Sequence, residues 1–125
     1  MNYKTRGRVE AEISEALIKF EREHMGRGPA ETRTYIMGDM IFIRLKGVLT
    51  PAERQLAKTS EGSALIKQVR RQLFENSRGL LEDIIYGLTK TKVISMHTDI
   101  STKTGERVII FTIKENLKDR FKEKG

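Results

Sequence analysis

Ser95, His97 and Asp99 carry the three side-chain types of a hydrolytic triad, and they alternate along one segment of the chain. In a strand, such residues point to the same side of the sheet. Their backbones would stand roughly 7 Å apart from one to the next, whereas known triads join separated segments that fix each approach. The surrounding sequence offers no oxyanion hole, so we interpret the three residues as a polar strand face and not as catalytic residues.

A second group, Gly26-Arg27-Gly28, could hold a small anion. Backbone N–H groups at such glycines can form a nest, and a guanidinium above the nest would complete the site. The same residues also suit the end of a helix that leads into a strand. The Gly-Lys-Ser/Thr ending of a phosphate-binding loop is absent. Both interpretations stay open, with Arg27, Gly26 and Gly28 as candidate contacts for an anion or metabolite.

A third group is basic and lies on one helical segment. It contains Arg70 and Arg71, with Lys67 before them and Arg78 after them, in a chain of formal net charge +7. Such a charge permits attraction to nucleic acid. However, aromatic residues make up only 6% of the chain, and acidic residues on the same segment dilute the patch. We therefore favour a solvated helix face with ion pairs, and keep nucleic-acid binding through Arg70 and Arg71 as an alternative.

The composition fits a small intracellular domain. A chain of 125 residues can form one domain with its own core. It has no cysteine, which excludes disulfides and thiolate metal ligands, and its two histidines belong to no metal-binding pattern. We therefore expect no cofactor and no metal. No segment approaches the roughly 18 apolar residues of a membrane span, so we expect a cytoplasmic protein, either free or peripheral to a membrane.

The first half of the chain predicts a helix and a hairpin. Apolar residues at helical spacing indicate a helix over residues 4–25, and Gly26 and Pro29 should end it. A basic arm at residues 1–8 overlaps the beginning of this helix. Residues 32–37 and 40–46 read as strands. Gly38-Asp39 between them suits a two-residue type II′ turn.

The second half predicts two helices and another hairpin. Thr50, Pro51 and Glu53 form a capping box that opens a short helix. A long helical pattern follows from residue 60 or 63 to residue 88, with a weak point at residues 76–79 that leaves its continuity open. Residues 92–100 and 106–114 form the second hairpin. Asn116 is expected to cap a frayed helix in the charged tail, residues 115–125.

These elements predict an α+β fold in the order helix, hairpin, two helices, hairpin, with helices packed on an antiparallel four-stranded sheet. The segment 108–113 is apolar on both faces, so both sides of the sheet should be covered. A continuous helix over residues 60–88 would be roughly 40 Å long and would overhang the sheet. Both observations lead us to expect a homodimer.

The order of motifs resembles the MpsC-like family of small bacterial domains. The resemblance is carried by Gly26-Arg27-Gly28-Pro29, by the segment 47–53 and by Val69-Arg70-Arg71, and it covers residues 8–115. It implies a single domain over residues 1–125 and a link to a Na⁺-translocating, membrane-potential-generating system, but no catalytic residues. We therefore expect a non-enzymatic interaction or regulatory domain, a soluble accessory with a membrane-associated protein partner.

Overall fold

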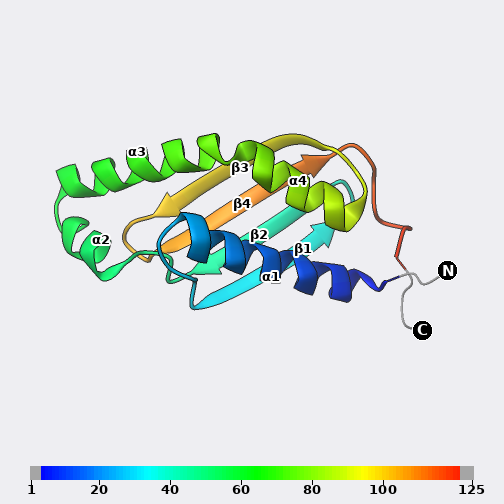
Figure 1. Ribbon diagram of the computed structural model, residues 1–125, viewed down its shortest axis with the longest axis horizontal. Helices are drawn as coiled ribbons and strands as arrows, with labels where there is room; N and C mark the ends of the chain where they lie inside the picture. The colour runs from blue at the N-terminus through cyan, green and yellow to red at the C-terminus, as the bar shows by residue number, and fades with distance from the viewer. Residues whose placement is uncertain (1–3, 122–125) are drawn as a thin grey trace.

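The computed structural model describes residues 4–121 and places the helices on one side of a four-stranded antiparallel sheet, with α2 at one end (Figure 1). The elements are α1 (Arg6–His24), β1 (Glu31–Met37), β2 (Met40–Lys46), α2 (Pro51–Leu56), α3 (Ser60–Asn76), α4 (Arg78–Thr89), β3 (Val93–Ser101) and β4 (Glu106–Ile113). The predicted α+β class and the two hairpins are confirmed. Residues 1–3 of the basic arm and 122–125 of the tail lie outside the described residues.

The two hairpins join in the middle of the sheet. The strand order is β1-β2-β4-β3, and β2 pairs with β4 with Ile43 opposite Ile109. Gly38 has a φ of 63°, whereas Asp39 is not in the left-handed region, as a type II′ turn requires. The predicted turn therefore sets the register of the first hairpin, which pairs Met37 with Met40.

The core lies between the sheet and the helices. Every second residue of β2 and β4 is buried, beginning at Ile41 and Arg107, and the intervening residues remain at least partly exposed. From α1, four buried residues form the apolar stripe that faces this layer: Val9, Ile13, Leu17 and Phe20. A single layer of helices thus covers one face of the sheet and leaves the other face uncovered by the described residues.

The long helical pattern is interrupted at Ser77. This residue ends α3 and precedes α4, with φ −100° and ψ 6°. Asn76, Ser77 and Gly79 are weak helix formers, so the interruption costs little there. The chain therefore has three helices between its hairpins, because the second of the two expected helical segments is divided at the weak point whose continuity the sequence left open. The beginning of α3 still projects past the sheet, where α2 packs against it (Figure 1).

The predicted helix in the tail is wrong within the described residues, where turns follow β4. Leu117 is buried, and its N–H donates to the carbonyl of Gly38 at 2.8 Å. The side chain of Asn116 accepts from the N–H of Lys118 at 2.8 Å, which is a local turn contact that competes with a helix. The burial of Leu117 thus decides the path of the tail.

Gly62 allows the close contact between α2 and α3. A Cβ at this position would lie 1.8 Å from the carbonyl oxygen of Leu56, a backbone atom that cannot rotate away. We expect Gly62→Ala to lower the free energy of unfolding by at least about 2 kcal/mol, because the two helices must separate. Urea unfolding measures this change.

Gly87 provides the matched control for that substitution. It also lies in a helix, but a Cβ there would meet nothing within 4 Å. Gly87→Ala should stabilise the chain by about 0.5–1 kcal/mol, because alanine loses less backbone entropy in a helix. If the two substitutions had equal effects, the tight contact at Gly62 would be contradicted.

Candidate functional site

Arg70 lies in the core and not on a solvated helix face. Only 1% of its surface is exposed. Its Nε and Nη2 donate to the two carboxylate oxygens of Glu53 at 2.8 and 2.7 Å, and Nη2 also donates to the carbonyl of Val48 at 3.0 Å. The interpretation of Arg70 as a solvated or nucleic-acid-facing residue is therefore wrong, because α3 turns this side chain inward and Arg71 outward.

The capping box holds Glu53 in position for this contact. As predicted, the Thr50 side chain accepts from the N–H of Glu53, and the Glu53 carboxylate accepts from the N–H of Thr50 at 2.9 Å. The same carboxylate receives the fork of Arg70. The beginning of α2 and the middle of α3 are therefore joined by one side chain that caps a helix and pairs a buried cation.

Two more buried charged residues complete a group that we call the buried charge cluster: Glu21, Glu53, Arg70 and Arg107. Glu21 comes from α1, and its Oε1 lies 3.8 Å from Nη1 of Arg70. Arg107 comes from β4 and lies 3.8 Å above the ring of Phe74. Four elements, α1, α2, α3 and β4, thus each contribute one charged side chain to this cluster.

Burial controls the ionisation of the cluster. It raises the pKa of Glu21 to about 7, although the charges of Arg107 and Arg70 oppose the rise. Burial also lowers the pKa of Arg107 to about 10, against the attraction of Glu21. Partial burial acts in the upward direction on Glu53, but hydrogen bonds from Arg70 and Thr50 lower its pKa overall.

The cluster is not fully hydrogen bonded within the described residues. Both oxygens of Glu21, Nη1 of Arg70, and Nε and Nη2 of Arg107 have no hydrogen-bond partner there. The cluster contains two acids and two guanidinium groups, which balance in charge when all are ionised, and it contains no hydroxyl or thiol group. Its chemistry is that of a buried ion-pair network that joins elements and fixes their arrangement.

The Ser95, His97 and Asp99 side chains share one side of β3, as predicted, but they form no triad. The hydroxyl of Ser95 is hydrogen bonded to that of Thr112 on β4. Asp99 accepts from the N–H of Ile100 at 2.8 Å and lies 3.6 Å from the Nζ atom of Lys67. Within the described part of the chain, no group of three or more His, Cys, Asp or Glu could hold a metal ion.

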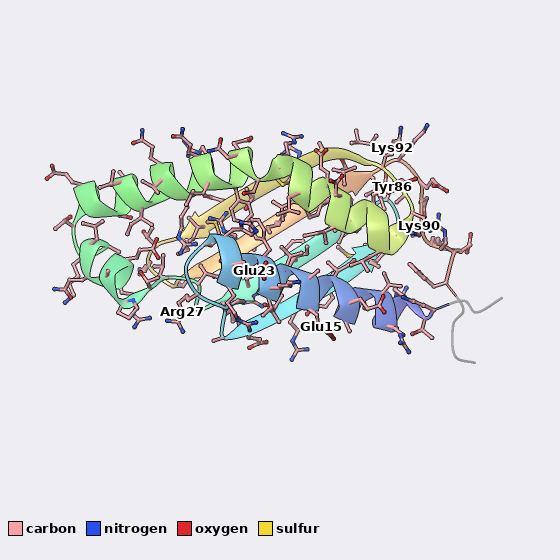
Figure 2. The ribbon with its side chains drawn as sticks, viewed as in Figure 1. Glu15, Glu23, Arg27, Tyr86, Lys90 and Lys92 are labelled. Carbon is pink, nitrogen blue, oxygen red and sulfur yellow. The ribbon has the colours of Figure 1, made fainter. Side chains whose placement is uncertain are left out.

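Arg27 lies at the rim of the molecule, in the loop after α1 (Figure 2). It is half-buried, and its guanidinium donates to the carbonyls of Gly28 and Leu49, both at 3.4 Å. Gly26 has a φ of 108° and follows the end of α1, which is the role expected of it. The two carbonyl contacts therefore account for part of the hydrogen bonding of the Arg27 guanidinium. An anion site at Gly26, Arg27 and Gly28 stays a prediction.

An exposed row of aliphatic side chains follows α3 into α4. We call it the helix-side stripe; it comprises Leu65, Val69, Leu73 and Leu80. These side chains are 38–50% exposed. Beside the stripe, between α1 and α4, lies a groove of about 310 Å³ lined largely by apolar atoms from residues including Ala16, Phe20, Leu80 and Ile84.

The apolar pattern of the long helical segment includes these four residues, but it does not show by itself that they lie outside the core. The signal that could have found the stripe is the presence of apolar pairs at adjacent positions, such as Leu65-Ile66 and Leu80-Leu81. Neighbours in a helix are about 100° apart, so only one member of each pair can point into the core. Ile66 and Leu81 are buried, and Leu65 and Leu80 are exposed.

A second exposed apolar area is the side of the sheet that no helix covers. We call it the open sheet face; it comprises Arg33, Tyr35, Met37, Met40, Phe42, Arg44, Ser95, His97, Asp99, Val108, Ile110 and Thr112, with Glu31, Lys46, Ser101 and Glu106 at one end. Tyr35 and Met37 are 45% and 52% exposed. Val108 and Ile110 of β4 lie on the open side and are only partly buried, so the cover that was expected on both sides of β4 is present on one side within the described residues.

The fold and these sites define a small α+β domain with a buried charge cluster and two exposed apolar surfaces. The family profile described as "Na⁺-translocating membrane potential-generating system (MpsC)" matches residues 5–115. The chain belongs to this MpsC family. Within residues 4–121, no helix is long and apolar enough to cross a membrane.

Two proteins of Bacillus subtilis (strain 168) are similar to the chain. One, described as the uncharacterized protein YbcI, is 44% identical over 114 residues, which cover 91% of this chain and 92% of YbcI. The other, described as the uncharacterized protein YrhF, is 23% identical over 115 residues, which cover 87% of this chain and 90% of YrhF. No solved structure matches the chain.

Proposed function

We propose that the chain is a non-enzymatic interaction domain that binds a protein partner through the helix-side stripe. The observation that supports this function is the exposure of Leu65, Val69, Leu73 and Leu80 along one line of the molecule. Contiguous exposed apolar surface on a small protein is typical of a binding site. The reactive residue types are not assembled for catalysis in the described part of the chain, which favours binding over chemistry.

The shape of this surface favours an amphipathic helix as the bound element. The stripe repeats at intervals of four residues on α3, and the groove between α1 and α4 continues it. A helix that presents its own apolar residues at such spacing can fill a groove of this kind. Lys19 and Glu23 line the groove as well and offer charged groups of both signs to the rim of such a helix.

The family description suggests where this partner resides. We propose that the domain is a cytoplasmic accessory of a membrane ion-transport system and docks on a helix of the membrane component that extends beyond the bilayer. Nucleic-acid binding is less favoured, because one of its two candidate contacts, Arg70, is paired in the core.

Co-purification tests this proposal. The chain would be co-expressed with the membrane component of the system for which the family is named, and the complex extracted in detergent. We expect the wild-type chain to co-purify and Leu73→Glu to be lost from the complex, because a carboxylate would be placed in the apolar contact.

Leu56→Glu is the matched control, since Leu56 is a leucine on α2, outside the stripe, with an exposure of 44% against 38% for Leu73. It should co-purify as the wild type does. The proposal would be contradicted if the wild-type chain did not co-purify, or if the variants at Leu73 and Leu56 behaved alike.

A further inference from the structure

The open sheet face is organised in rows that run across the four strands. The register places Tyr35, Phe42, Ile110 and His97 in one row. The row on one side of it is Met37, Met40, Thr112 and Ser95. The row on the other side is Arg33, Arg44, Val108 and Asp99. The charged side chains are therefore gathered at one end of the face, whereas the apolar ones lie in its middle and, on β1 and β2, at its other end.

Each edge of the sheet carries a feature that hinders the addition of another strand. On β1, the N–H of Ile36 donates to Oε2 of Glu10 at 2.7 Å, so α1 occupies a backbone group that an added strand would need. On β3, a bulge between Val93 and Ser95 disturbs the pairing pattern. Such features protect edge strands from pairing with other chains. These features favour an element that packs on the face of the sheet over one that pairs with an edge.

The charges on this face are arranged so that the face complements itself. Arg33 and Arg44 lie on the β1–β2 side of their row, and Asp99 lies on the β3 side. At the charged end, Lys46 lies on β2 and Glu106 on β4. A two-fold axis along the strands would place the β1–β2 half of one copy, which carries the basic residues, opposite the β3–β4 half of the other copy, which carries Asp99 and Glu106.

We propose that two copies of the chain pack open sheet face against open sheet face, about a two-fold axis that runs along the strands between β2 and β4. This axis places β1 over β3 of the partner and β2 over β4 of the partner. Arg33 then faces Asp99 of the second copy, and Phe42 faces Ile110. The alternative axis, across the strands, would set the methionine row against the charged end, which is unfavourable.

The size of the open sheet face sets the strength that this contact can have. Four strands about 4.8 Å apart and about seven residues long give a footprint of roughly 19 by 24 Å. Two such surfaces have a combined flat area of roughly 900 Å², which is below the range of about 1,200–2,000 Å² that stable interfaces bury and fits a weak, reversible contact. Sheets that pack face to face keep their strands within about 30° of each other, which agrees with an axis along the strands.

This dimer goes beyond the proposed function, because it uses the opposite side of the domain. The helix-side stripes of both copies would point outward, away from the contact. Arg33 now lies 3.2 Å from Glu31, Arg44 2.5 Å from Glu106, and Asp99 3.6 Å from Lys67. In the dimer, Arg33 of one copy would pair with Asp99 of the other. This contact would connect the ion pair of Arg33 with Glu31 to the ion pair of Asp99 with Lys67.

Charge reversal with exchange between variants tests the arrangement. Light scattering after size-exclusion chromatography should give about twice the chain mass of 14.4 kDa at micromolar concentration. Arg33→Glu and Asp99→Arg should each raise the dissociation constant at least about tenfold, because like charges then meet at both copies of the contact. An equimolar mixture of the two variants should recover dimers, since every contact in a mixed dimer pairs opposite charges.

The mixture separates pairing from folding, because each variant keeps its own internal changes whether alone or mixed. Lys58→Glu, the same charge change in the turn between α2 and α3, should leave the dimer intact. A monomeric wild-type chain, or variants that do not recover dimers on mixing, would overturn the proposal. Dimers that are lost in Leu73→Glu and kept in Arg33→Glu would overturn it too, and would assign the contact to the helix side.

Discussion

Replacing Arg70 by methionine is expected to lower the free energy of unfolding by about 3–5 kcal/mol, the usual cost of removing one partner from a buried ion pair. Methionine has a similar length and can fill the space. However, Glu53 would lose its bidentate partner, Glu21 a nearby cation and the carbonyl of Val48 its donor. Urea unfolding followed by circular dichroism measures the change.

Arg71→Met is the matched control for this substitution. Arg71 is the next residue of the same helix and is exposed. Surface substitutions of this kind usually change the free energy of unfolding by no more than about 0.5 kcal/mol. Equal effects at the two arginines would show that Arg70 is not the buried centre of the cluster.

Replacing Glu21 by glutamine is expected to change how stability depends on pH. The pKa of Glu21 in the folded chain is raised to about 7 from an ordinary value of 4.5. A raised pKa stabilises the fold below pH 4.5, where the residue is protonated in both states, and this contribution is lost as the pH rises to 7. The wild-type chain should therefore lose about 2–3 kcal/mol between pH 5 and pH 8 from this residue alone.

Glu21→Gln should lack this loss, because an amide does not titrate. The difference in the free energy of unfolding between wild type and variant, measured in urea at both pH values, isolates the contribution of Glu21 from other titrating groups. Glu23→Gln, at an exposed position of the same helix, is the control and should keep the wild-type loss (Figure 2). A difference that stays constant between pH 5 and pH 8 would contradict a raised pKa at Glu21.

The local signals predicted much of the fold. The beginning of α2 follows from Thr50, Pro51 and Glu53, and the turn of the first hairpin follows from Gly38, because each involves contacts within a few residues. The break at Ser77 could not be decided, since a weak helix segment becomes a break only where packing turns the chain. The same holds for the tail, where the burial of Leu117 overrode a plausible helix cap.

The buried charge cluster could be predicted only in part. Arg107 begins the alternation Arg107, Ile109, Phe111 that places it on the buried face, and Glu21 follows Leu17 at helical spacing. These positions carried a readable signal. Arg70 and Arg71 did not, because apolar residues surround α3 on two sides and the sequence does not show which side meets the core.

The strand order β1-β2-β4-β3 also determines how the chain can fold. Each hairpin can form from neighbouring segments, but the joint between β2 and β4 unites Ile43 with Ile109, far apart in the chain. Closing so long a loop costs entropy before the central contacts form, and such non-local pairing slows folding. The barrier to folding should therefore lie at this joint, with each hairpin able to form and dissolve on its own before the joint closes.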